Sequence, residues 1–242
     1  MTTLPKNLDA LHSQEEQLRA KALELVAQDA KLGLHLAVTE QAMNVCDMLR
    51  QFQTEDENLK VIQMLGMRMF NAFGAGLKLA LSGYIQNSAL ILRVILEAVF
   101  LLDLFSGDHS LIAKWRFANA KILRQDFSPA AVRKTLDDRY GHTTRKREEL
   151  YKLFSELAGH PTMKSSWMMR PQRDGDAVIG PFIEKTSFDA VLSEMGRLAV
   201  QVGQHLVAFY PELWEAGKEP RASFAEATRN WFLTFYPGAF KQ

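Results

Sequence analysis

The sequence contains one cysteine, few glycines and prolines, no excess of either charge and no long unbroken apolar run. A single cysteine excludes an internal disulfide framework, and 14 glycines with 8 prolines in 242 residues exclude a collagenous or linker-rich chain. The net charge of +1 excludes a strongly basic nucleic-acid-binding composition. Arg93, Glu97 and Asp103 interrupt the most apolar stretch, residues 79–105, so we expect no membrane span. The start of the chain lacks the apolar segment of a secretory signal, and we expect a cytoplasmic protein.

Apolar residues make up 47% of the chain, and they recur at helical spacing along most of it. Residues 57–83 and 84–106 predict two central helices. The second is apolar almost all round, which in a water-soluble fold indicates burial on several sides. Ser128 followed by Pro129 predicts the start of a further helix, with serine as the N-cap and proline in the first helical position.

Residues 165–182 depart from this helical pattern. Two apolar runs flank Asp174-Gly175 there, which is the pattern of a β-hairpin. We therefore expect an all-α, multi-helix bundle with one small β-hairpin inserted near residues 165–182. The predicted organisation is one helical domain, residues 1–242, in which N-terminal helices (1–53) pack on a core (57–210) and a C-terminal helix (221–238) follows.

The common cofactor and metal motifs are absent from the sequence. It contains no phosphate-binding P-loop and no complete dinucleotide-binding glycine pattern. It also lacks the paired histidine and glutamate–histidine spacings of helical zinc and di-iron sites. Cys46 falls inside an amphipathic helix, where we expect a small core residue rather than a nucleophile. We expect no metal and no cofactor.

Polar residues form a row along the most apolar region. Ser82, Gln86, Arg93 and Glu97 are 4, 7 and 4 positions apart, a spacing that places them on one helical face. Arg93 and Glu97 can pair, and their apolar neighbours predict partial burial of that pair. Two interpretations stay open. The pair is a structural salt bridge, or it forms a pocket wall in which Glu97 anchors a ligand or transfers protons and Arg93 holds an anion.

A second group of polar residues follows near residue 155. Tyr151 and Ser155 are four positions apart on one helical face, and His160 precedes Pro161. The residue before a proline favours an extended backbone, so we expect the His160 ring to project from a loop. It is either a general base or binding group, or a cap on the preceding helix end, where positive charge is favourable.

These two motifs, followed by the expected short hairpin, together resemble an uncharacterised bacterial all-helical family associated with helical domains near phage-defence and toxin genes. The resemblance covers about residues 60–210. It implies that five residues meet at one site between helices: Arg93, Glu97, Tyr151, Ser155 and His160. The related HEPN ribonucleases carry an arginine and a histidine separated by four to six residues on one helix. The corresponding alternative pair here is Arg197 and His205, which seven residues separate.

Two further features concern partners. Residues 114–149 contain ten lysines and arginines against five acidic residues, so the segment is either a solvated helix face or a surface that tracks RNA phosphates, with Trp115 or Phe117 stacking on bases. We do not favour RNA. The C-terminal stretch is rich in aromatic residues, which predicts a surface covered in a homodimer. Its members are Trp231, Phe232, Phe235, Tyr236 and Phe240.

We therefore expect a helical protein that binds a partner or a small ligand through the polar cluster between its helices. The alternative is a HEPN-like ribonuclease or another phosphodiester-acting enzyme. In that case His160 or His205 would be the base, and Arg93 or Arg197 would stabilise the anion.

Overall fold

The computed structural model describes residues 4–172 and 174–238, and every regular element within these ranges is helical. Four long helices form a bundle: α2 (Ala30–Gln51), α3 (Glu57–Leu81), α4 (Ile85–Gly107) and α9 (Lys185–Val207). The other α-helices are α1 (Lys6–Gln28), α5 (Ser110–Arg116), α6 (Ala120–Asp126), α7 (Pro129–Tyr140), α8 (Lys146–Phe154) and α10 (Lys218–Phe235). Shorter turns are the π-helical η1 (Ser155–Gly159) and the 3-10 turns η2 (Ser165–Met169) and η3 (Glu215–Gly217).

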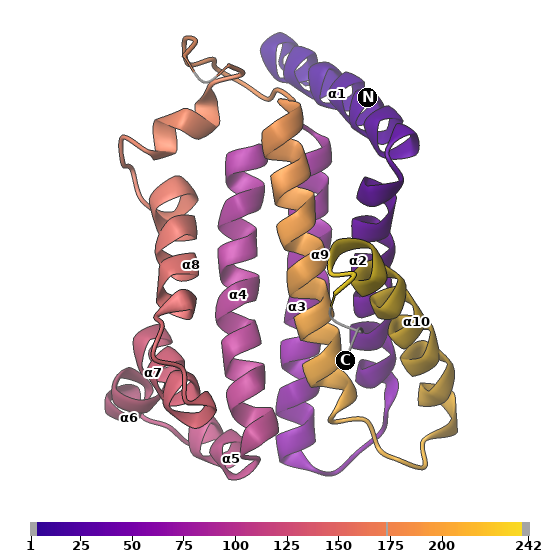
Figure 1. Ribbon diagram of the computed structural model, residues 1–242, viewed down its shortest axis with the longest axis vertical. Helices are drawn as coiled ribbons and strands as arrows, with labels where there is room; N and C mark the ends of the chain where they lie inside the picture. The colour runs from indigo at the N-terminus through magenta and orange to yellow at the C-terminus, as the bar shows by residue number, and fades with distance from the viewer. Residues whose placement is uncertain (1–3, 173, 239–242) are drawn as a thin grey trace.

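Helix α4 lies near the middle of the molecule, with other helices on several sides of it. It packs on α3 and α9 of the bundle, and α7, α8 and η1 contact its other flank (Figure 1). Leu92, Ile95 and Phe105 are completely buried there. Each such side chain contributes roughly 2–3 kcal/mol through removal of apolar surface from water. The all-round apolar character of this segment follows from that position.

Two glycines on α9 allow its neighbours to approach closely. Gly196 and Gly203 are seven positions apart and so share one face of the helix. A Cβ atom on Gly203 would lie 2.2 Å from the Phe224 ring of α10, and one on Gly196 would lie 2.8 Å from Nδ1 of His35 on α2. Because these two positions carry no side chain, α2 and α10 can pack close to the backbone of α9.

The predicted β-hairpin is wrong. Among the described residues of 165–182 there is no strand, and the segment begins with η2. The expected turn is present, because Gly175 N–H donates to the Gln172 carbonyl. Among the described residues, however, only the backbone bond from Val178 N–H to the Met169 carbonyl links its two sides. Prolines at 171 and 181 carry no N–H donor, and Phe182 N–H bonds to Gly83 instead. The two sides therefore do not form the ladder of backbone hydrogen bonds that a β-hairpin requires.

The C-terminal helix begins earlier than expected and covers much of its own apolar surface. It starts at Lys218 rather than at 221, because Pro220 is tolerated in a first turn whose N–H groups lack partners within the helix. Trp231 is buried, and Phe232 and Phe235 pack against the core. Phe240 lies outside the described residues. The aromatic stretch is thus largely covered by the chain itself, so it is a weak argument for a homodimer.

Across residues 4–172 and 174–238, none of the helices has both the length and the apolar character needed to cross a membrane.

Candidate functional site

Arg93 and Glu97 form an ion pair on α4, with Nη2 of Arg93 3.2 Å from Oε1 of Glu97. Their side chains are 22% and 35% exposed, so the pair lies at the edge of the core and not within it. Arg93 Nη2 also donates a hydrogen bond to the Tyr151 hydroxyl, whereas its buried Nε makes no hydrogen bond. The pair therefore belongs to a contact between α4 and α8, and Glu97 keeps one side towards solvent.

Two guanidinium groups lie close to the Tyr151 ring. The guanidinium carbon of Arg93 is 4.8 Å from the centre of the Tyr151 ring, and that of Arg133 on α7 is 4.1 Å from it. Cations over an aromatic face are attracted by its quadrupole, and the effect grows when water is excluded. Glu97 forms an ion pair with Arg93, whereas Arg133 forms no ion pair among the described residues.

Ser155 and His160 do not join this contact as functional groups. The Ser155 hydroxyl donates to the Tyr151 carbonyl at 2.8 Å, a bond within its own helical segment. His160 has the expected extended backbone, with φ −133° and ψ 148°, and its side chain is exposed. Gly159 of η1 lies against Arg93, because a Cβ atom there would be 3.5 Å from Nη1. The structure thus brings together Arg93, Glu97 and Tyr151 of the five predicted residues.

Glu97 also lines a cleft of about 450 Å³ between α3, α4, α5 and α7. This volume falls within the range of roughly 300–1,000 Å³ that is usual for small-molecule sites. Arg68 of α3 lies on the wall too, and no hydrogen bond or ion pair of its side chain is found among the described residues. The rest of the lining is apolar and includes Met64, Val94, Phe100, Trp115, Phe127 and Val132.

The alternative ribonuclease pair is separated in space along α9. Arg197 pairs with Glu194, three positions before it, and Nδ1 of His205 lies 3.3 Å from the Ser106 hydroxyl of α4. Eight residues of helix span about 12 Å along its axis. Each of the two side chains therefore has a different partner, and they do not form a common site.

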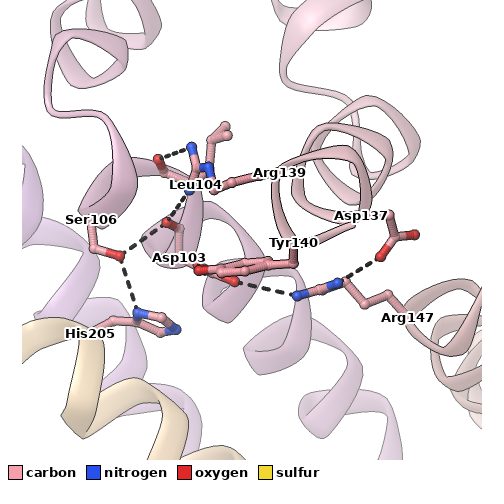
Figure 2. Close-up of polar contacts among 8 residues, drawn as sticks. All are labelled: Asp103, Leu104, Ser106, Asp137, Arg139, Tyr140, Arg147 and His205. Carbon is pink, nitrogen blue, oxygen red and sulfur yellow. Dashed lines mark hydrogen bonds and ion pairs between the residues drawn. The ribbon is translucent and has the colours of Figure 1, made fainter. Parts of the chain in front are cut away.

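His205 borders a polar network, centred on the buried Asp103, that the sequence did not single out (Figure 2). Asp103 accepts a hydrogen bond from the Tyr140 hydroxyl at 2.7 Å, and its other oxygen lies 3.8 Å from Arg147. Arg147 pairs with Asp137 at 2.6 Å, and Arg139 donates to the Asp103 and Leu104 carbonyls at the end of α4. The network joins α4 to α7 and α8. Burial lowers the pKa of His205, so its imidazole is neutral near pH 7.

Many cations of the basic segment 114–149 are used within the protein. Lys114 pairs with Asp126 at 2.9 Å, Lys134 with Asp138 at 2.7 Å, and Arg147 and Arg139 belong to the network above. Trp115 lines the cleft, whereas Phe117 is exposed. These contacts favour a structural role for much of the positive charge over a continuous phosphate-tracking surface.

Comparison with protein-family models, curated proteins and solved structures found no significant match. Among the described residues, no group of three or more His, Cys, Asp or Glu side chains could hold a metal ion.

Proposed function

We propose that this protein binds a small, largely apolar molecule in the cleft between α3, α4, α5 and α7. The proposal rests on one observation: Glu97 forms an ion pair with Arg93 and also lines the cleft. The polar cluster expected from the sequence thus borders a concave apolar surface of suitable volume. A few polar groups on an otherwise apolar wall are the usual composition of a ligand site.

The charges on the wall define the head group of the ligand. Glu97 has Arg93 as its counter-ion, whereas the side chain of Arg68 has no acidic partner among the described residues. The unbalanced charge in the cleft is therefore positive. An aromatic or aliphatic body with one anionic group fits this wall, because its apolar part covers Trp115 and Phe127 while the anion lies near Arg68.

The test uses anilinonaphthalene sulfonate, an aromatic anion whose fluorescence rises in apolar sites. Val94→Phe enlarges a side chain on the cleft wall and fills the site. Ala190→Phe is the matched control, because Ala190 lines a second apolar pocket, of about 390 Å³, beside α8 and α9. We expect the wild type and Ala190→Phe to bind the probe similarly. Val94→Phe should weaken binding roughly tenfold or more, with a melting temperature near that of the wild type.

Equal probe affinity in Val94→Phe and the wild type would overturn the proposal, as would the absence of saturable binding by the wild type. Native mass spectrometry supplies an independent readout. A small-molecule mass excess on the purified wild type that is missing from Val94→Phe would support the same site. The homodimer, the cytoplasmic location and the HEPN-like activity stay predictions from the sequence.

A further inference from the structure

A further pocket, of about 370 Å³, lies between α7 and α8, and its wall is mostly charged. Its lining includes Arg133 and Lys134 of α7 and Arg145 and Glu148 at the start of α8. It is distinct from the cleft proposed above, because α7 presents Pro129 and Val132 to the cleft and Ala130, Arg133 and Lys134 to this pocket.

Arg133 is the unusual member of this wall. Its side chain stacks on Tyr151, only 9% of the residue is exposed, and its buried Nη1 makes no hydrogen bond. No carboxylate of the described residues lies within ion-pair distance of it. A buried guanidinium with an unused donor is costly unless a further acceptor is supplied. An anion in the pocket would supply an acceptor to Arg133, which lines it.

The acidic residues of the wall already have cationic partners. Asp137 pairs with Arg147 at 2.6 Å, and Asp138 pairs with Lys134 at 2.7 Å. Glu148 pairs with Lys152 at 2.7 Å and lies 3.7 Å from Arg145. All three carboxylates are thus engaged in ion pairs, whereas Arg133 forms no ion pair among the described residues.

The N-terminus of α8 adds donors at the same place. Its N-cap position is Arg145, whose side chain accepts no hydrogen bond from the first turn. The first N–H groups of a helix have no partner within the helix, and the helix dipole favours negative charge beside them. A phosphate group is well suited to this combination of backbone N–H groups and a guanidinium.

We propose that the pocket between α7 and α8 binds the phosphate group of a small phosphate monoester, with the Arg133 guanidinium and the N-terminus of α8 as its anchors. The pocket is larger than a free phosphate ion requires. The organic part of an ester would occupy the remaining space, against His142 and Thr143.

The test follows the amide NMR signals of residues 146–148 during titrations with inorganic phosphate, glycerol phosphate and, as the ionic-strength control, sodium chloride. We expect saturable shifts with both phosphates, tighter binding of glycerol phosphate, and no saturable shift with chloride. Tighter binding of inorganic phosphate than of the ester would overturn the assignment to a monoester. Absence of saturation with either phosphate at millimolar concentration would overturn the site.

Variants then assign the anchors. Arg133→Gln should weaken phosphate binding roughly tenfold. Because this variant also loses the stacking on Tyr151, Lys134→Gln provides a second test at an exposed position. Lys134→Gln leaves Asp138 on the wall of the pocket without its cationic partner, so we expect phosphate affinity to fall roughly threefold. Lys121→Gln on α6 makes the same charge change outside the pocket. Equal affinities for Lys134→Gln and Lys121→Gln would contradict the proposal.

Discussion

The indole Nε1–H of Trp231 on α10 donates a hydrogen bond to Nδ1 of His35 on α2 across 2.9 Å. His35 is only 4% exposed, and its ring stacks on Phe235 with a centroid separation of 4.3 Å. An acceptor at Nδ1 requires the proton of the neutral imidazole to be on Nε2. The hydrogen bond between Trp231 of α10 and His35 of α2 therefore requires His35 to be uncharged.

The first prediction is that acid weakens this contact. Burial lowers the pKa of His35 to about 4 from 6.5, although Asp29 and Asp189 act in the opposite direction. Since the unfolded chain binds the proton near pH 6.5 and the folded one only near pH 4, the contribution is complete above pH 6.5 and is lost as the pH falls. We expect a loss of about 3 kcal/mol in unfolding free energy at pH 4.

Urea unfolding at a series of pH values measures this effect, with His35→Gln as the reference. The glutamine oxygen can accept the indole hydrogen bond but does not titrate. Other groups contribute equally to both proteins, so the difference between the two profiles isolates His35. If the stability profiles of the wild type and His35→Gln were parallel between pH 6.5 and pH 4, His35 would bind its proton at the same pH in the folded and the unfolded chain, and the prediction would be wrong.

The second prediction contrasts two glycines. Gly203→Ala on α9 should destabilise the protein by roughly 1–3 kcal/mol, because the new Cβ atom would overlap the Phe224 ring. Gly74→Ala on α3 meets no atom within 4 Å and should stabilise it by roughly 0.5–1 kcal/mol through higher helix propensity. Thermal unfolding of both variants tests the pair. A stabilising effect at Gly203 would mean that α10 moves away from α9 without cost.

The third prediction compares a buried and an exposed aspartate. Asp103→Ala removes the acceptor of the Tyr140 hydroxyl and one carboxylate near Arg147, and should cost about 2–3 kcal/mol of stability. Asp126→Ala removes only the exposed pair with Lys114 and should cost less than about 1 kcal/mol. Chemical denaturation distinguishes the two values. Similar small losses would indicate that water replaces the Asp103 contacts.

The parts of the fold that the sequence predicted are those set by local interactions. The predicted helices 57–83 and 84–106 correspond to α3 and α4 within two residues. Helix α7 begins at Pro129, and the Ser128 hydroxyl accepts a hydrogen bond from the Ala131 N–H, as its cap. Hydrophobic period and capping chemistry act within one or two turns, so one sequence suffices to recognise them.

The errors concern choices that depend on distant segments. Asp174-Gly175 marks a turn, but whether its flanks pair is decided by the competing bond from Phe182 to Gly83. In the candidate site, the Arg93–Glu97 spacing is local and visible in the sequence. Arg133 reaches the same tyrosine through the packing of α7 on α4 and α8, which no spacing encodes. Arg133 also lies in a segment rich in charged residues, for which the sequence predicts exposure to solvent, so its burial was not expected.

The last prediction concerns the two charges on the wall of the α3–α4 cleft. If the ligand group there is an anion, Arg68→Gln should weaken binding of anilinonaphthalene sulfonate and Glu97→Gln should strengthen it, each by roughly threefold to tenfold. Arg229→Gln on α10 changes the net charge far from the cleft and should leave the affinity unchanged. Fluorescence titration at low and high salt measures these effects, and salt should reduce the differences. Equal weakening by Arg68→Gln and Arg229→Gln would show that the probe responds to net charge. The head group would then have no specific contact with Arg68, and the ligand class proposed for the cleft would have to change from an anion to an uncharged apolar molecule.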